Sequence, residues 1–217
     1  MKRISLTEMH KQKLAEYGLQ GISIDACECR RYEPGEMIYR EFENISWIGL
    51  VMEGYSKVCR TAENGKTLIL CYYITNGVIG DIELMSGKTT ALASLTAISY
   101  FECVTVRFQA CLSEMKTNLD FLNKLATGLA GKLVETSGNF ISAALCSGEQ
   151  RLCSYILQTS YCDVFRDILT DVSCSIGLSY RHVTRLLKQL CDEGILEKRA
   201  TGYYIAKRDL LLRRAQY

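Results

Sequence analysis

Several side chains between positions 180 and 188 can donate hydrogen bonds to phosphate groups or to the edges of nucleic-acid bases. They are Tyr180, Arg181, His182, Arg185 and Lys188. The apolar positions among and after them recur at helical spacing: Val183, Leu186, Leu187 and Leu190. One helix would therefore bury an apolar stripe and present a basic face to the outside. A helix of this kind, with its basic residues in the N-terminal half, suits the major groove of DNA.

The flanking sequence predicts the elements that would position this basic helix. A short helix at Thr170–Ile176 leads to a turn at Gly177, and Ser179 is of a residue type that begins a second helix. After it, Ile195–Lys198 and Gly202–Ile205 predict a β-hairpin. We expect Ser179 to meet a phosphate at the start of the helix, and Lys198, Arg199 and Thr201 to do so from the hairpin. The pattern predicts a winged helix-turn-helix domain at residues 146–217, in which a helix at Gln150–Ser160 leads into the DNA-binding elements.

The charge distribution agrees with a separate nucleic-acid-binding module. Residues 1–145 hold 15 Lys and Arg against 16 Asp and Glu, whereas residues 179–217 hold 9 against 4.

Without an apolar run of about 18 residues, or an apolar segment at the N-terminus, we expect a cytoplasmic protein with no membrane partner. The only histidines, His10 and His182, stand in no spacing typical of a catalytic triad, and no phosphate-binding P-loop occurs, so an enzyme is not expected.

The 11 cysteines could do chemistry of another kind. Cys27 and Cys29 are the closest pair, and no Cys-x-x-Cys motif occurs, so neither a zinc ribbon nor a thioredoxin-type redox site is supported, and no metal-binding residues are predicted. Most cysteines stand among apolar neighbours, which is typical of small buried side chains. The alternative is a thiol or iron–sulfur sensor that uses Cys27 and Cys29 with others.

Residues 1–112 predict an antiparallel β-roll or barrel preceded by a helix at residues 5–19. The turns of this region are rich in glycine, as at Pro34-Gly35-Glu36, Glu53-Gly54 and Glu63-Asn64-Gly65. The β-prone runs between them are Met37–Tyr39, Ile45–Met52, Ser56–Thr61, Thr67–Ile74, Ala91–Ala97 and Tyr100–Phe108. The fold class is therefore α+β.

Residues 113–145 return to a helical pattern, with one apolar seam on a long helix. The seam consists of Leu122, Leu125, Leu129, Leu133, Thr136 and Phe140. A long helix between two domains favours contact with a second copy of the chain, so we expect a homodimer. Gly128 and Gly131 cost the helix about 1 kcal/mol each and would let a partner helix approach closely.

This order of roll, long helix and winged helix resembles the catabolite-activator and fumarate–nitrate-regulator (CRP/FNR) family of bacterial transcription regulators. The residues that carry the resemblance are Pro34-Gly35-Glu36, Met52-Glu53-Gly54-Tyr55, Glu63–Leu70, Gly77-x-x-Gly80-Asp81, Ile176-Gly177-Leu178-Ser179 with Arg185, and Gly194-Ile195-Leu196. The start Ser179–His182 resembles most the YeiL-type branch. The resemblance, which covers about residues 20–210, implies a regulator that binds a DNA operator, and RNA polymerase if it activates.

The family's effector pocket is where the sequence departs. By resemblance, the pocket would include Gly80, Asp81, Glu83, Leu84, Thr89, Thr90 and, on the long helix, Thr136 and Ser137. Cyclic-nucleotide members carry Arg-Ser where this chain has Ala91-Leu92, so the phosphate would lack its charged partner. Cyclic AMP is therefore not expected, and the effector is not identified. The alternative function is a cyclic-nucleotide-binding-like regulatory module that acts on a protein partner rather than on DNA.

Overall fold

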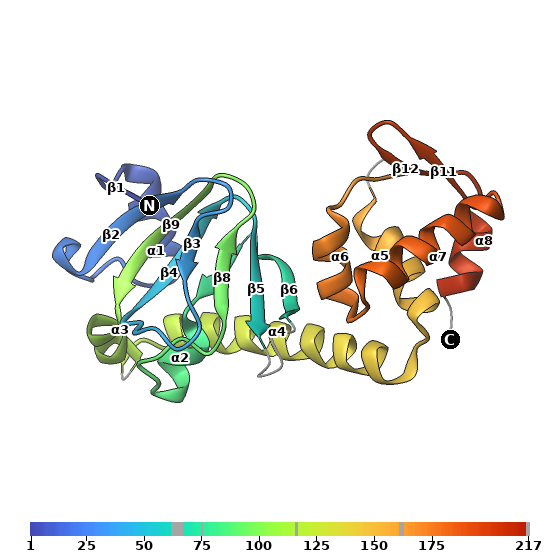
Figure 1. The fold of residues 1–217 in the computed structure, drawn as a ribbon. Helices are drawn as coiled ribbons and strands as arrows, with labels where there is room; N and C mark the ends of the chain where they lie inside the picture. Colours follow the sequence, from blue (N-terminus) through green and yellow to red (C-terminus); the bar gives the residue numbers. More distant parts are fainter. Residues whose placement is uncertain (62–66, 75, 116, 161–162, 216–217) are drawn as a thin grey trace. The chain divides into compact units, whose positions relative to one another are not determined.

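The computed structural model describes residues 1–61, 67–74, 76–115, 117–160 and 163–215. Contacts divide the chain into two compact units (Figure 1). The first unit consists of Met1–Arg60 and Leu70–Glu135, and the second of Thr61–Ile69 and Thr136–Tyr217. Each has its own hydrophobic core. The division into residues 1–112, 113–145 and 146–217 that the sequence predicts stays a prediction.

The first unit is built on two antiparallel sheets. Their orders are β1-β2-β9-β4-β7 and β3-β8-β5-β6. The strands of the first sheet are β1 (Lys2–Ile4), β2 (Cys27–Tyr32), β9 (Phe101–Arg107), β4 (Trp47–Glu53) and β7 (Val78–Ile79). Those of the second are β3 (Met37–Tyr39), β8 (Ser94–Ala97), β5 (Ser56–Thr61) and β6 (Thr67–Ile74). This is the expected β-roll. The predicted turn Glu63–Gly65 lies outside the described residues.

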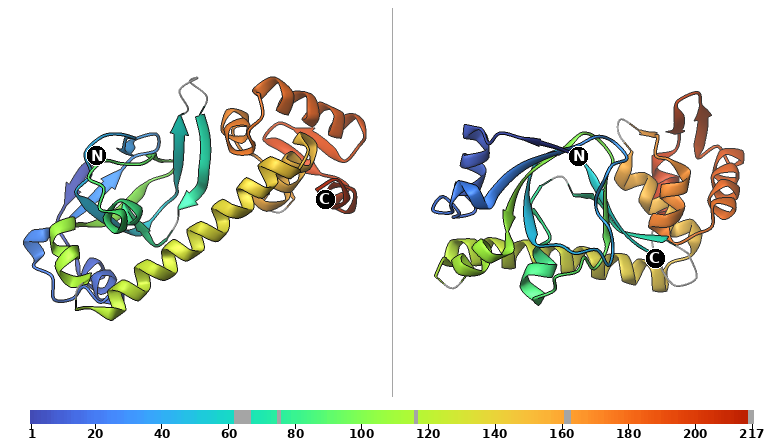
Figure 2. Two further views of the ribbon diagram at one scale, coloured as in Figure 1. Left: turned by 90° about the horizontal axis from the view of Figure 1, so that it is seen from below. Right: turned by 60° about the vertical axis from the view of Figure 1, so that its left-hand side comes forward.

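Alternation along β2 and β9 gives the five-stranded sheet two buried faces. Tyr32 pairs with Phe101, and both side chains enter the core between the two sheets. Cys27 pairs with Val106, and both belong to a second core on the other face. Helices cover that second face. Figure 2 shows α1 (Glu8–Glu16), α3 (Phe108–Met115) and the start of α4 (Leu119–Leu145) gathered at one end of the roll.

The helix predicted from Ser113 is two helices, which corrects the sequence reading. α3 ends at Met115, and α4 begins at Leu119. Asn118 holds the break: its Oδ1 accepts the Phe121 N–H at 3.0 Å, and its Nδ2 donates to the Gly18 carbonyl at 2.6 Å. The new start turns α4 so that Phe121 and Leu125 enter the core of the roll.

Leu125 is therefore not part of an exposed seam, contrary to the prediction. Its side chain is fully buried in the core below the five-stranded sheet. The face of α4 that continues from it at helical spacing carries Lys132, which binds residues of the roll. The other predicted seam positions are less covered: Leu122 and Leu129 are half-buried, and Leu133, Thr136 and Phe140 are exposed.

The remaining elements of the first unit are short. They are η1 (Ile24–Ala26), a single 3₁₀ turn before β2, and α2 (Asp81–Ser86). α2 begins at Gly80, whose φ of 78° places it in the left-handed region. A Cβ at this position would lie 2.7 Å from the Trp47 carbonyl oxygen, so only glycine fits. Sequence reasoning missed α2, together with β1, β2 and β7.

The second unit contains the predicted winged helix. Its helices are α5 (Gly148–Thr159), α6 (Leu169–Ile176), α7 (Tyr180–Asp192) and α8 (Arg208–Ala215), and its three-stranded sheet has the order β10-β12-β11. The strands are β10 (Val164–Phe165), β11 (Leu196–Arg199) and β12 (Gly202–Ile205). Side chains of all four helices and of the sheet share one core, with Phe165, Leu187 and Leu211 among its buried members. The sequence did not predict β10 and α8.

No helix among the described residues is long and apolar enough to cross a membrane.

Candidate nucleic-acid interface and effector region

The geometry of α7 follows from its two faces. Val183, Leu186, Leu187 and Leu190 are buried in the core of the second unit, as their spacing predicts. The Ser179 hydroxyl oxygen accepts the His182 N–H at 3.2 Å and so caps the first turn. Tyr180, Arg181, Arg185 and Lys188 are exposed. Because Arg181, Arg185 and Lys188 follow one another at four and three residues, their side chains form one basic ridge along the helix.

His182 differs from the rest of the predicted set because it is only half-buried and has a neighbour. A Cβ added at Gly148, the first residue of α5, would lie 3.4 Å from His182 Cε1 and 3.1 Å from a Leu178 methyl carbon. The imidazole therefore packs beside the start of α5. Glycine at position 148 leaves room for this contact.

The turn between α6 and α7 is held by a residue that sequence reasoning missed. Gly177 ends α6 with a φ of 64°. Arg151, on α5, donates from Nη1 to the Ile176 carbonyl oxygen at 2.6 Å, the last carbonyl before the turn. Its Nε is buried and has no hydrogen-bond partner among the described residues. A cation at a helix C-terminus also offsets the negative end of the helix dipole. The sequence signals the role of Arg151 only weakly, as an arginine on a helix whose other face is apolar.

The hairpin of β11 and β12 exposes the predicted phosphate contacts. Lys198, Arg199 and Thr201 are all exposed near its tip. Arg199 lies over the ring of Tyr204, with 3.8 Å between the guanidinium carbon and the ring centroid, and it pairs with Glu197 at 3.3 Å. The stacking restrains the guanidinium on the hairpin.

The acidic residues of the predicted effector region have partners within the protein. Asp81 is buried, and both of its carboxylate oxygens accept from Lys132 Nζ, at 2.6 and 2.7 Å. Lys132 Nζ also donates to the Val78 carbonyl oxygen at 2.7 Å. Glu83 is buried and accepts the Leu92 N–H at 2.9 Å. A ribose hydroxyl would therefore have to share Asp81 with Lys132 and Glu83 with the Leu92 N–H.

The other predicted pocket residues are spread over different environments. Leu84 is part of the apolar core, whereas Thr89 and Thr90 are exposed. Thr136 and Ser137 are exposed residues of the second unit, so their part in a pocket stays a prediction. An open groove of about 680 Å³ lies elsewhere, between residues 15–20 and 120–128, and none of the predicted effector residues lines it.

The cysteines that the structure describes are free thiols. Burial raises the pKa of Cys27, and it raises the pKa of Cys111 and of Cys153 to about 12. Thiols of this kind are poor nucleophiles because little thiolate forms. Within the described residues, no three cysteines converge on one point. An iron–sulfur cluster bound by Cys27 and Cys29 would need further cysteine ligands, and no third cysteine of the described residues lies close enough to both.

Comparison with known proteins agrees with this architecture. Residues 29–118 match the cyclic nucleotide-binding domain family. The regulatory protein YeiL of Escherichia coli O157:H7 is 25% identical over 176 residues, which is 81% of this chain and 80% of that protein.

Solved structures share the fold over nearly the whole chain. The c-di-GMP-responsive global regulator CLP of Xanthomonas campestris superposes with a TM-score of 0.78 at 16% identity, covering 90% of this chain and 99% of that one. FixK2 of Bradyrhizobium japonicum gives 0.72 at 18% identity, with 88% and 98% covered. A CRP/FNR-family regulator of Eubacterium rectale gives 0.78 at 13%, with 97% and 95% covered.

YeiL and CLP are both named as regulators, in agreement with the expectation from the sequence. The expected fold class is confirmed, and so is the resemblance, including its YeiL-type direction. Together, these comparisons show that residues 29–118 belong to the cyclic nucleotide-binding domain family, and that the chain has the fold of a solved CRP/FNR-family regulator and resembles the regulatory protein YeiL over most of its length.

Proposed function

We propose that the chain acts as a homodimer that reads a DNA operator with α7 and adjusts this binding to a signal received by the β-roll. The observation that carries the proposal is the division of α7 into a buried apolar stripe and an exposed basic ridge of Arg181, Arg185 and Lys188. A major groove admits a helix of this kind, and arginine can donate two hydrogen bonds to guanine O6 and N7.

The contacts divide into base reading and phosphate binding. Arg181 and Arg185 lie in the N-terminal half of α7, the part of a recognition helix that reaches base edges. Ser179 and Tyr180 at the helix start, Lys188 further along, and Lys198, Arg199 and Thr201 on the hairpin would contact phosphates. His182 packs beside α5, so we assign it a supporting contact rather than base reading.

The dimer would form through the exposed face of α4. Leu133 and Phe140 are 68% and 72% exposed and lie seven residues, about two turns, apart. Leu122 and Leu129 extend the same face toward the start of the helix, and Thr136 lies within it. An apolar stripe of this length on one helix favours a partner helix with the same stripe, because a twofold axis brings identical faces together. Two half-sites on DNA would then meet two copies of α7.

The signal received by the roll is not cyclic AMP in this proposal. Positions 91 and 92 hold Ala and Leu, so the arginine that would bind the phosphate is absent there. Asp81 and Glu83 already have protein partners. CLP is described as responsive to cyclic di-GMP, but its likeness to this chain is one of fold at 16% identity. If the protein activates transcription, it would also contact RNA polymerase.

A selection from random duplex DNA tests the proposal. The full-length protein should enrich a sequence with two related half-sites about 10 base pairs apart, or a multiple of that spacing. A variant with Arg181→Ala and Arg185→Ala together should enrich nothing. The matched control is Arg213→Ala, which removes an exposed arginine from α8 and should leave the selected sequence unchanged. Failure of the wild-type protein to enrich any sequence would favour action on a protein partner instead.

A further inference from the structure

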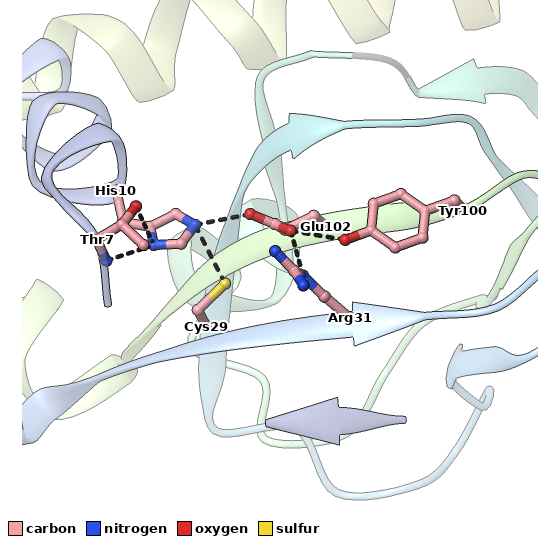
Figure 3. A network of polar contacts seen from close by, with 6 residues as sticks. All are labelled: Thr7, His10, Cys29, Arg31, Tyr100 and Glu102. Atoms are coloured by element: carbon pink, nitrogen blue, oxygen red, sulfur yellow. Dashed lines mark hydrogen bonds and ion pairs between the residues drawn. The ribbon is translucent and has the colours of Figure 1, made fainter. Parts of the chain in front are cut away.

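Three side chains that commonly bind metal ions meet in the buried interior of the first unit, and none of them belongs to the predicted effector pocket (Figure 3). They are His10 on α1, Cys29 on β2 and Glu102 on β9, and all three are buried. His10 Nε2 lies 2.7 Å from Glu102 Oε1 and 3.3 Å from Cys29 Sγ. The nitrogen, the sulfur and a carboxylate oxygen all lie within 4.8 Å of one another.

The fold brings these residues together from distant parts of the sequence. Cys29 pairs with Val104 and Arg31 pairs with Glu102 on the neighbouring strand, so Cys29 and Glu102 are diagonal neighbours on one face of the sheet. α1 covers that face and inserts His10 between them. The apolar core lies beside them, since Leu14 on α1, Cys27 on β2 and Val104 on β9 belong to it. A site with its ligands at positions 10, 29 and 102 has no short motif, which is why the sequence predicts none.

The outer partners of the three groups leave the inner atoms pointing at one another. Glu102 Oε2 accepts from Arg31 Nε at 2.6 Å and from the Tyr100 hydroxyl at 2.9 Å, whereas Oε1 faces His10. His10 Nδ1 accepts the Thr7 backbone N–H at 2.8 Å and lies 3.0 Å from the Thr7 hydroxyl. Outer hydrogen bonds that orient a ligand carboxylate are common around bound metal ions; the imidazole differs from the usual arrangement, because its Nδ1 accepts a hydrogen bond here where a metal-bound imidazole donates one.

We propose that His10 Nε2, Cys29 Sγ and Glu102 Oε1 bind one divalent transition-metal ion, of which zinc is the best fit. Imidazole nitrogen, thiolate sulfur and carboxylate oxygen are the ligands that zinc takes in proteins, and a thiolate ligand disfavours magnesium and calcium, which prefer oxygen. The proposal is independent of DNA binding, so either can fail without the other.

Binding requires two proton movements that balance. Cys29 bonds the ion as a thiolate, so its thiol proton leaves to solvent. Burial, followed by the negative charge of Glu102, raises the pKa of Cys29 to about 12 without an ion, and the charge of a bound cation reverses that effect. The Thr7 N–H shows that Nδ1 of His10 is an acceptor, so the ring proton is on Nε2 and must move to Nδ1 before Nε2 can bind the ion.

This second movement couples the ion to the start of α1. A protonated Nδ1 can no longer accept from the Thr7 backbone N–H, but it can donate to the Thr7 hydroxyl oxygen 3.0 Å away. Ion binding therefore releases one backbone hydrogen bond at the first turn of α1. We expect the Thr7 amide to exchange its hydrogen faster with the ion bound, while the core strands exchange more slowly.

The test uses the full chain after treatment with a chelator. Cobalt is titrated as a visible probe for the zinc site and then displaced with zinc. We expect one ion per chain and the intense absorption of a cobalt–thiolate bond. Cys29→Ser should remove that absorption. Tyr100→Phe, which removes only an outer hydrogen bond to Glu102, should weaken binding by about 10–100-fold.

The matched control is Cys27→Ser, which changes a buried thiol on the same strand and the same face and should keep both the absorption and the stoichiometry. Circular dichroism on each variant establishes that it is folded. The wild-type protein decides the question even if Cys29→Ser does not fold. Absence of a cobalt–thiolate absorption, or iron and inorganic sulfide in protein purified without oxygen, overturns the proposal. An absorption that depends on Cys27 instead of Cys29 does so as well.

Discussion

Lys132 Nζ binds both carboxylate oxygens of Asp81, at 2.6 and 2.7 Å, and thereby fixes the first half of α4 against α2. The Asp81 side chain is 3% exposed and that of Lys132 29%. Asp81 is one of the residues that the sequence predicts, by resemblance, to lie in an effector pocket. In this chain, the Asp81 carboxylate forms an ion pair with Lys132, on the helix that carries the proposed dimer face. An anionic effector group would compete with Asp81 for Lys132.

Breaking this pair should destabilise the first unit. Lys132→Met keeps the apolar stem but leaves the buried Asp81 carboxylate without its cation, and we expect a loss of about 3 kcal/mol in the free energy of unfolding. Asp81→Asn together with Lys132→Met should recover part of that loss, because no uncompensated charge is then buried. Urea denaturation followed by circular dichroism measures both. Lys88→Met, an exposed lysine of the same unit, serves as the control and should change stability little.

Dimer formation should depend on the exposed face of α4 and not on its buried face. Leu133→Asp places a charge in the proposed apolar contact and should shift the protein toward monomer in sedimentation velocity, with little change in the stability of the monomer. Asp at Leu125 is unsuitable for this test, since that side chain is fully buried and the variant would unfold the roll. A wild-type protein that sediments as a monomer at micromolar concentration would contradict the dimer.

Sequence patterns predicted the elements of the second unit well because its signals are local. The stripe Val183–Leu190, the cap at Ser179 and the turn at Gly177 each depend on neighbours within a few residues. β10 was missed because two residues carry no periodicity, and its pairing with β12 joins residues about 40 positions apart. Arg151 was missed for the same reason, since its partner is the Ile176 carbonyl.

The α4 seam shows where periodicity alone fails. Leu125 and Leu129 are four residues apart and look equivalent in the sequence, yet Leu125 is fully buried and Leu129 half-buried. The difference depends on the rotation of the helix, which is set by Phe121 in the core and by Lys132 bound to Asp81. The site of His10, Cys29 and Glu102 was out of reach for a similar reason, because strand register rather than spacing brings its members together.

Arg151 should act as a positioning residue for α7. Arg151→Met removes the hydrogen bond to the Ile176 carbonyl oxygen while keeping apolar contacts, and we expect the second unit to lose about 1–3 kcal/mol of stability. DNA affinity should fall without a change in the selected sequence, because the residues that read bases are intact. Arg151→Lys restores the charge and should recover part of the affinity. A changed base preference in Arg151→Met would show that Arg151 itself reads DNA.

The pH dependence of stability should carry the signature of Asp167. Burial raises the pKa of Asp167, and hydrogen bonds from Tyr155 and Thr159 offset this only in part. Between the ordinary pKa near 4 and the raised value, the folded protein holds the proton that the unfolded chain has lost, so stability falls as pH rises through that window.

One variant of Asp167 and one of its partner Tyr155 should change this pH dependence in opposite directions. The stability of Asp167→Asn relative to wild type should be higher at neutral pH than at pH 3, because the variant removes the cost of the buried charge. Tyr155→Phe removes a donor to the carboxylate Oδ2, 2.9 Å away, and should steepen the fall of stability with pH. Urea denaturation across this pH range measures both. Changes of the same sign in the two variants would contradict the assignment.

Arg185 and Arg199 should separate base reading from phosphate binding. Arg185 lies on the exposed ridge of α7, and its loss in Arg185→Ala should cost about 1–3 kcal/mol on the selected operator and weaken the preference at one base pair of each half-site. Arg199 lies on the hairpin over Tyr204, and Arg199→Ala should weaken binding to all sequences alike. It should also reduce the slope of log affinity against log salt by about one for each subunit.

The comparison needs fluorescence anisotropy on the operator and on a scrambled duplex, each over a range of salt concentrations. Because Arg199 also pairs with Glu197, Glu197→Gln is the matched control for that pairing; it should leave the base preference unchanged and, if anything, strengthen binding by removing a negative charge near the phosphates. If Arg185→Ala kept the full base preference and Arg199→Ala lost it, the two roles would be reversed, with the hairpin as the reader and α7 as the anchor.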